Sequence, residues 1–288
     1  MMSYLEHIRA CNACDAAAFR PFRHGGETVG RVHVSLLPHL LALSGIFTAG
    51  DDGGVALAPH HDTPGHGDTA MTQATKLLVR AGRLPPPRGE AYAVKTAWHA
   101  PTRFLLDRAH VPLFGCRAFG VHLNGFVRQG GALKLWIGRR ADDRPVAPGK
   151  LDNMVAGGQP AGLSLGQNLL KEAAEEASLP AALAAAARPV GAISYCLQDG
   201  MLLRPDTMFL YDLELPADFI PRNTDGEITG FTLMDVDEVA DRVRGGHDFK
   251  YNVNLVLIDF LIRHGHLTPD DEPDYLALIA GLRHPALA

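Results

Sequence analysis

Three glutamates in the stretch LLKEAAEEASL, namely Glu172, Glu175 and Glu176, have the spacing most suggestive of chemistry in this chain. The spacing i, i+3, i+4 brings side chains together on an α-helix, which turns about 100° per residue. Three adjacent carboxylates repel one another unless cations lie between them, and hard oxygen ligands of this kind suit Mg²⁺ or Mn²⁺. The pattern predicts a divalent-metal site on a helix, although a solvated acidic face of a surface helix has the same spacing.

A glycine-rich turn, GGQPAG, leads into this helix, which we expect from about Ser164 to Ala177. Glycines permit backbone conformations and close approaches that other residues resist, so the turn favours the functional interpretation. The glutamates are expected on the side of the helix opposite its apolar residues. That apolar side comprises Leu169, Leu170, Ala173, Ala174 and Ala177.

Residues 157–179 resemble the Nudix box, whose pattern is G-x5-E-x7-R-E-U-x-E-E-x-G-U with U an aliphatic residue. Gly157 is the opening glycine, and Lys171 stands where arginine is usual. Leu163 replaces the first glutamate of the pattern, and Ser178 replaces its last glycine. The resemblance implies an α+β protein with the α/β/α sandwich and mixed sheet of the Nudix (MutT-like) hydrolases. The missing glutamate puts in doubt how the helix is anchored and how many metals are held.

In this family the box forms a loop and helix that bind metal and diphosphate. Carried over position by position, the resemblance implies that the metal is held by Gly157, Glu172, Glu175 and Glu176. One of the glutamates would be the base that activates water. The diphosphate of the substrate would lie against Gly158, Gly162 and Lys171.

Longer phrases, such as FGVHLNGFV (119–127), LDNMVAGGQPAGLS (151–164) and YNVNLVLIDFLIRHG (251–265), are similar to one Nudix subfamily. It includes the Nudix portion attached to fungal thiamine pyrophosphokinase and its stand-alone plant and microbial relatives. That resemblance implies activity on thiamine diphosphate or damaged forms of it. Asn124 and Asn153 belong to these phrases and are expected to line the substrate cleft.

A further carboxylate, Glu227, follows the turn Asp225–Gly226 and precedes an apparent strand. Nudix proteins often supply one more ligand or base from outside the box, and Glu227 resembles that residue. An ordinary acidic turn has the same sequence, and only geometry decides between the two.

The elements that must position these residues form two parts. We expect a small α+β domain of unassigned role over residues 1–115, opening with a helix at Tyr4–Ala18, and a Nudix domain with C-terminal helices over residues 116–288. Alternating patterns predict its strands at Phe119–Val127, Leu133–Gly138, Val190–Cys196, Met208–Leu215 and Thr229–Met234. Helices are expected at Val236–Arg244 and Asn254–His264. A pocket between the two parts would let the first domain help choose the substrate.

The composition excludes several classes of partner. A net charge of −5 with scattered basic residues disfavours nucleic acid, and no apolar run reaches the ~18 residues of a membrane span. The N-terminus lacks a signal-peptide pattern, and four cysteines in 288 residues are no disulfide framework, so we expect a cytoplasmic protein with reduced thiols. A second copy of the chain, in a homodimer, is the macromolecular partner that the composition does not exclude.

The function expected is Mg²⁺-dependent hydrolysis of a diphosphate linkage in a small organic diphosphate, with thiamine diphosphate or an oxidised analogue as the leading substrate. Two alternatives stay open. The chain could act on nucleotide sugars or other nucleoside diphosphate derivatives. It could also be a non-catalytic ligand-binding or regulatory module with a decayed box, for which Leu163 argues and the three glutamates argue against.

Overall fold

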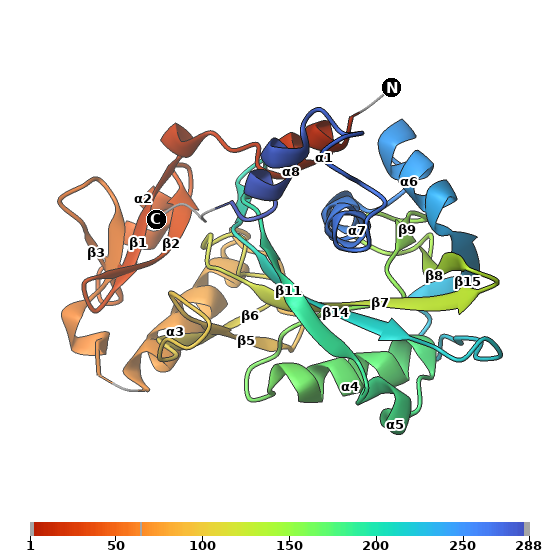
Figure 1. Cartoon of the computed structure of the whole chain (residues 1–288). Helices are drawn as coiled ribbons and strands as arrows, with labels where there is room; N and C mark the ends of the chain where they lie inside the picture. The colour runs from red at the N-terminus through yellow and green to blue at the C-terminus, as the bar shows by residue number, and fades with distance from the viewer. Residues whose placement is uncertain (1–2, 64, 285–288) are drawn as a thin grey trace.

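The computed structural model of the protein describes residues 3–63 and 65–284, and a seven-stranded sheet lies at its centre (Figure 1). The strand order is β11-β14-β7-β8-β15, with β10 paired to β7 and β9 paired to β8. Only β14 and β7 run parallel among these pairs of the described chain, so the sheet is mixed. The strands are β7 (Phe119–Gln129), β8 (Ala132–Arg140), β9 (Leu151–Asp152), β10 (Val155–Gly158), β11 (Arg188–Ser194), β14 (Thr207–Glu214) and β15 (Ile228–Asp235).

Helices cover both faces of the central sheet (Figure 1). One face carries α4 (Leu165–Ala177) and α5 (Ala181–Ala184). The other carries α1 (Tyr4–Cys11), α6 (Val236–Gly245), α7 (Tyr251–Arg263) and α8 (Tyr275–Gly281). Because it lies between two helical layers, β7 is buried along most of its length. The expected α/β/α sandwich with a mixed sheet is therefore confirmed, and the five strands expected for it are present within two residues of their ends.

The first helix of the chain packs in the core of the second half. The expected helix Tyr4–Ala18 is wrong in length: α1 ends at Cys11, and a short 3-10 helix follows at Ala16–Ala18. The Tyr4 hydroxyl donates to the carbonyl of Ala240 at 3.1 Å, and His7 Nε2 lies 2.6 Å from the carbonyl of Val243. The division at residue 115 stays a prediction, but α1 shares a hydrophobic core with α7 and α8.

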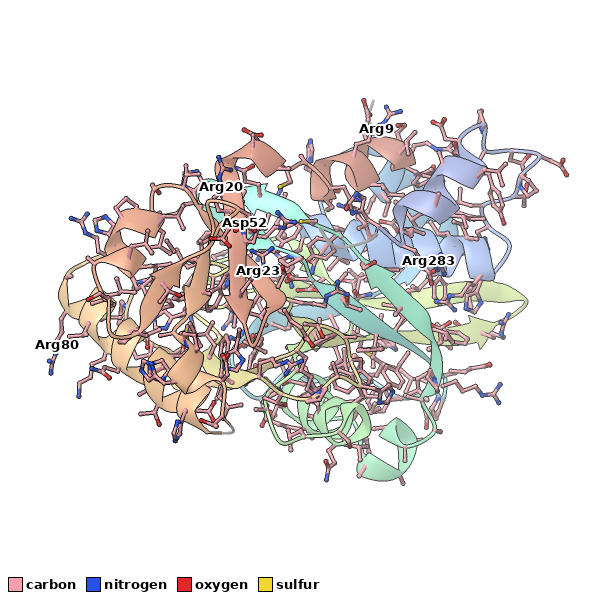
Figure 2. All side chains as sticks on the ribbon, turned by 90° about the vertical axis from the view of Figure 1, so that its left-hand side faces the viewer. Arg9, Arg20, Arg23, Asp52, Arg80 and Arg283 are labelled. Atoms are coloured by element: carbon pink, nitrogen blue, oxygen red, sulfur yellow. The ribbon has the colours of Figure 1, made fainter. Side chains whose placement is uncertain are left out.

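The first half also builds a smaller sheet of order β2-β1-β4-β3. Its strands are β1 (Phe19–His24), β2 (Glu27–His33), β3 (Phe47–Ala49) and β4 (Val55–Leu57). Around it lie α2 (Leu37–Leu41), a 3-10 helix (Pro59–His61), α3 (His66–Arg80) and the hairpin of β5 (Ala91–Val94) and β6 (Phe104–Asp107). On this face of the molecule Arg23 forms an ion pair with Asp52 (Figure 2).

A second hairpin, of β12 (Leu197–Asp199) and β13 (Leu202–Arg204), contacts β2 and lies between the two halves. Arg204 ends this hairpin, immediately before the loop that enters β14. Over residues 3–63 and 65–284, no helix has the length and apolar character needed to cross a membrane.

Candidate active site

The helix that carries the three glutamates is α4, and its start is set by a capping box. Ser164 Oγ accepts from the backbone N–H of Gln167 at 3.2 Å, and Gln167 Oε1 accepts from the backbone N–H of Ser164 at 2.9 Å. These two bonds satisfy N–H groups that a helix otherwise leaves unpaired. The capping box fixes the angle at which the chain passes from the glycine-rich turn into the helix.

The three glutamates do not share one environment. Glu176 is 6% exposed, and its Oε2 accepts from the backbone N–H of Ala156 in β10 at 2.8 Å. The side chain of Glu172 is 12% exposed and that of Glu175 is 48% exposed. Placing all three opposite the apolar side is therefore wrong for Glu176. It follows Leu169 by seven residues and Ala173 by three, so it lies on the buried side of the helix.

Burial changes the acidity of two of these groups. Removal from water raises the pKa of Glu176 well above its usual value, and the negative charges of Asp152, Glu172 and Glu227 raise it further. Burial also raises the pKa of Glu172, against the opposing effect of Lys171. Glu176 and Glu172 are therefore weaker acids than an exposed glutamate.

Lys171 lies between the other two carboxylates. Its Nζ is 3.1 Å from Glu172 Oε1 and 2.9 Å from Glu175 Oε2. Burial lowers the pKa of Lys171, but hydrogen bonds to Glu175 and Glu172 outweigh this and raise it overall. The expected contact between Lys171 and substrate stays a prediction, because the structure pairs its ammonium with two members of the trio.

The two glycines of β10 permit close approaches. A Cβ at Gly157 would overlap the carboxyl group of Glu172, and a Cβ at Gly158 would overlap the hydroxyl of Tyr92. Tyr92 belongs to β5, so the first half of the chain touches the glycine-rich turn directly. Gly162 is exposed at the end of that turn with φ +88°, a conformation that favours glycine.

Two amide side chains anchor the turn where the box has lost its first glutamate. Gln159 Nε2 donates to the carbonyl of Leu163 at 2.7 Å. Asn168 is fully buried, and its Nδ2 donates to the carbonyl of Gly158 at 2.8 Å. The turn is therefore held without a glutamate at position 163.

Substituting Leu163 by glutamate should consequently change little. We expect the range of diphosphates cleaved to stay the same and the apparent affinity for Mg²⁺ to change by less than about fivefold, since Gln159 and Asn168 already hold the turn. Steady-state kinetics at varied Mg²⁺ concentrations measures both. A large gain in rate would show instead that the natural chain is impaired at this position.

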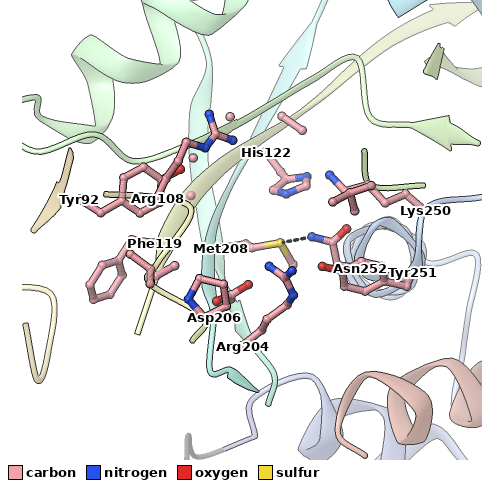
Figure 3. A pocket seen from close by; sticks show the side chains of 18 of the residues that line it. Tyr92, Arg108, Phe119, His122, Arg204, Asp206, Met208, Lys250, Tyr251 and Asn252 are labelled. Atoms are coloured by element: carbon pink, nitrogen blue, oxygen red, sulfur yellow. Dashed lines mark hydrogen bonds between the residues drawn. The ribbon is translucent and has the colours of Figure 1, made fainter. Parts of the chain in front are cut away.

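Beside the glycines lies a cavity of about 210 Å³ whose walls come from both halves of the chain (Figure 3). Two carboxylates, Asp206 and Glu227, face six cationic side chains in its lining. The cations are Arg88, Arg108, Arg140, Arg144, Arg204 and Lys250. In a chain of net charge −5, such an excess of positive charge produces a local field that attracts anions.

Four of the six cations have acidic partners. Arg140 lies 2.7 Å and Lys250 3.5 Å from the same carboxylate oxygen, Oδ2 of the buried Asp152. Burial raises the pKa of Asp152, but Lys250 and Arg140 outweigh it and keep the carboxyl ionised. Arg108 pairs with Glu90 at 2.6 Å, on the side of the cavity that belongs to the first half.

The pairing of Arg144 with Glu227, at 2.7 Å, places that glutamate at the cavity. Its charge also reaches Glu176, whose pKa it helps to raise. Arg88 and Arg204 differ from the other cations, because neither guanidinium has an ion pair within 4.0 Å or a hydrogen bond in the described part of the chain. The charge of Arg204 nevertheless acts on Asp206, where it opposes the rise in pKa that burial causes.

Asn124 and Asn153 lie beneath the cavity wall and do not line it. Asn153 Nδ2 donates to Asn124 Oδ1 at 2.8 Å, and Asn124 Nδ2 donates to Asp212 at 3.0 Å. Asn153 Oδ1 is 2.8 Å from Nδ1 of His122, which does line the cavity. Burial and the charge of Lys250 lower the pKa of His122 to about 4, so its ring is neutral at neutral pH. The two asparagines orient His122, and direct contact with substrate stays a prediction.

The donors near Gly157 have the chemistry of a hard-cation site: carboxylate oxygens at a glycine that leaves room for Glu172. No group of three or more His, Cys, Asp or Glu side chains in residues 3–63 and 65–284 is already arranged to hold a metal ion. Two contacts account for this, since Lys171 lies between Glu172 and Glu175, and Glu176 is turned toward Ala156. The residues fit a divalent cation that takes the place of the Lys171 ammonium.

The cationic cluster has no signature in the sequence. Arg88 and Arg108 lie in the first half, while in the second half Arg144 and Lys250 lie in separate loops and Arg204 ends β13. No short spacing connects them, because the fold brings them together over long separations in the chain. The segment RGEAYAV, in which Arg88 precedes the strand of Tyr92, offered no periodic signal.

Comparison with known proteins adds relatives over the whole chain. A family model described as a domain of unknown function (DUF4743) matches residues 3–118. The chain is 40% identical over 287 residues to "Nudix hydrolase 24, chloroplastic" of Arabidopsis thaliana, covering 99% of this chain and 78% of that protein. It is 34% identical over 207 residues to the uncharacterized protein YJR142W of Saccharomyces cerevisiae, covering 67% of this chain and 59% of that protein.

Solved structures of Nudix proteins overlap with about half of the chain. The match to the NUDIX domain of Shewanella oneidensis NrtR, complexed with ADP ribose, covers 52% of this chain and 90% of the NrtR chain. The identity is 13% and the TM-score is 0.41. The match to DR0079 from Deinococcus radiodurans covers 49% of this chain and 82% of DR0079, with 23% identity and a TM-score of 0.39. The identity to the plant relative over nearly the full length decides the matter: this chain belongs to the Nudix hydrolase family.

Proposed function

We propose that this Nudix hydrolase cleaves the diphosphate of a small organic diphosphate, with Mg²⁺ as the metal and thiamine diphosphate or an oxidised analogue as the leading substrate. One observation carries the proposal. The glutamate-bearing helix and its glycine turn meet a cavity lined by six cations, which exceed by two the carboxylates in the lining (Asp206 and Glu227) and those paired with it (Glu90 and Asp152). Phosphate oxygens complement this charge, and a carboxylate-held metal complements it from the other side. The thiamine assignment rests on the subfamily resemblance of residues 119–127, 151–164 and 251–265.

The metal would be held by carboxylates of Glu172, Glu175 and Glu176 and by the carbonyl of Gly157. When bound, a divalent cation at such a site neutralises diphosphate charge and acidifies water. The remaining work belongs to this chain's side chains. Arg88 and Arg204, whose guanidinium groups form no ion pair within 4.0 Å among the described residues, bind and orient the phosphate oxygens. Arg144 keeps Glu227 directed along the cavity wall.

A glutamate takes the proton of the attacking water as the new oxygen–phosphorus bond forms. The bond between that phosphorus and the bridging oxygen breaks, which leaves the monophosphate and inorganic phosphate as products. Glu172 suits the role of base, because burial raises its pKa toward the pH at which the enzyme works. Glu227 is the other candidate, because it lines the cavity itself.

The test is hydrolysis of a panel of diphosphates, of which only thiamine diphosphate would release inorganic phosphate while the others would give two organic monophosphates. Thiamine diphosphate, ADP-ribose and UDP-glucose would be supplied with Mg²⁺ or with EDTA, followed by chromatography of the products. We expect Mg²⁺-dependent conversion of thiamine diphosphate to its monophosphate, at a rate at least ~100-fold above that of Glu172→Gln prepared in parallel. That variant controls for contaminating phosphatases. Cleavage that is equal in the variant, or unaffected by EDTA, would overturn the proposal.

A further inference from the structure

A second cavity, of about 570 Å³, adjoins the first. It lies between α1, the β12–β13 hairpin and the first turn of α7, and it is lined in part by His7, Cys11, Leu197 and Phe249. Its lining shares five residues with the first cavity, which are Pro145, Val146, Arg204, Lys250 and Tyr251. Figure 3 shows Arg204, Lys250 and Tyr251 at the wall of the first cavity. The two cavities therefore meet at a boundary that carries two cations.

The chemistry of the second cavity differs from that of the first. Rings supply much of its lining: His7, His247, Phe249 and Tyr251. His7 and His247 meet edge to face, with ring centroids 6.1 Å apart. Burial lowers the pKa of His7, so its ring is neutral at neutral pH. Flat rings of this kind contact the faces and edges of a planar ligand.

One buried polar group in this cavity has no partner. Asn254 lines it and is 2% exposed. Its Oδ1 accepts no hydrogen bond in the described part of the chain, and its Nδ2 reaches only the carbonyl of Tyr251, at 3.5 Å. Buried polar groups are nearly always paired, so an unpaired one at a cavity wall calls for an explanation, and a group on a ligand that enters the cavity supplies one. The missing partner must bring a donor, because an amide oxygen only accepts.

We propose that the second cavity binds the organic group of the substrate, and that this group is a planar nitrogen heterocycle whose amino group donates to Asn254 Oδ1. The proposal rests on the diphosphate hydrolysis proposed above. The phosphates lie among the cations of the first cavity, and the connecting atoms pass Arg204, Lys250 and Tyr251. The heterocycle lies among the rings, with the N-terminal helix α1 as one wall. Asn254 is then a specificity-determining residue outside the Nudix box.

Two variants test the second cavity without touching the first. Asn254→Leu keeps the side-chain shape and removes the acceptor. Ala10→Phe adds bulk at an exposed residue of α1 that lines the second cavity. Each should raise KM for thiamine diphosphate about tenfold, as expected for one lost hydrogen bond or a narrowed cavity, while kcat changes less than about twofold. The inhibition constant of imidodiphosphate, which has phosphates and no organic group, should not change.

Two matched controls accompany them. Arg9→Phe adds the same ring one residue away on α1, outside the residues that line the cavity, and should leave KM unchanged. Asn252→Leu removes a buried amide from the same turn of α7, facing the first cavity, and should alter KM for thiamine diphosphate and the inhibition constant of imidodiphosphate by the same factor. Thermal unfolding checks that every variant is folded.

The outcomes separate this inference from the proposed function. If the wild-type enzyme cleaves neither thiamine diphosphate nor ADP-ribose, the proposed function fails, and the second cavity loses its substrate with it. If it cleaves either one but Asn254→Leu and Ala10→Phe raise KM no more than Arg9→Phe, the proposed function stands and the second cavity is not the heterocycle site. If Asn254→Leu weakened the binding of imidodiphosphate as much as that of thiamine diphosphate, the inference would likewise be overturned, because the substitution would then affect binding of the phosphates.

Discussion

Replacing Glu176 by glutamine should lower kcat at least ~100-fold and, at the same time, raise the thermal unfolding midpoint in the absence of metal. Activity falls because a buried carboxylate ligand is lost, an effect of the size seen when one key electrostatic group is removed. Stability rises because burial penalises the ionised carboxylate of Glu176, whereas glutamine keeps the acceptor for the Ala156 N–H without the charge. Each kcal/mol gained corresponds to roughly 2–4 °C.

The difference in unfolding midpoint between the wild type and Glu176→Gln should increase with pH. Because the folded-state pKa of Glu176 is raised, the penalty is absent below the unfolded-state pKa of about 4.3 and grows as the pH rises toward the folded value. In EDTA the midpoints of wild type and variant should converge near ~pH 4 and separate by ~pH 8. Added Mg²⁺ should stabilise the wild type more than the variant.

Glu175→Gln is the matched control for the stability effect. Glu175 is 48% exposed, so its substitution should reduce activity to a similar degree with no rise in the midpoint. Full activity in both Glu175→Gln and Glu176→Gln would contradict the assignment of the metal site. A midpoint of Glu176→Gln that does not depend on pH would contradict the buried-charge argument.

Substituting Gly157 by alanine is the second change expected to have a large effect. The φ of Gly157 is outside the left-handed region, so the backbone accepts alanine, but the new methyl group would overlap the carboxyl group of Glu172. Glu172 must then move, and we expect kcat to fall about 100-fold in phosphate-release assays. The substitution should lower kcat more than it changes KM, since the cations that bind phosphate are not altered.

A double substitution identifies the cause. If alanine at position 157 acts by displacing Glu172, it should cost less than about threefold more in a Glu172→Ala background. Gly166→Ala is the control: Gly166 lies in the first turn of α4, and a methyl group there would meet no atom within 4 Å, so activity should be kept. Losses that multiply in the double variant would show that Gly157 contributes independently of Glu172.

The local parts of the site were predictable from the sequence. The spacing of the glutamates, the glycines before them and the length of α4 are properties of 23 consecutive residues, 157–179, and the structure reproduces them. The environment of Glu176 was not predictable from the sequence, because a side chain at the edge of a helical face is buried or exposed according to what packs beside it. Here the neighbour is β10, a four-residue strand with no recognisable alternation.

The distant parts of the site were not predictable. Tyr92 meets Gly158, and Arg88 and Arg108 line the first cavity together with Glu227, only because two cores pack together in the folded chain. The same holds for α1, because the sequence predicted a helix there but not which sheet it would cover. A periodic pattern indicates that one face of a helix is buried, but tertiary packing decides which element that face contacts.

The packing of α1 has a consequence for how the protein is made. Tyr4 and its partner Ala240 are 236 residues apart, and α1 also contacts α8 near the end of the described chain. A ribosome adds about 5–20 residues per second, so α1 waits on the order of ten to fifty seconds for the helices it packs against. During synthesis its apolar face has no native partner. The small sheet and the hairpin of β5 and β6 can fold earlier, but the core around α7 closes only when α1 and α8 meet.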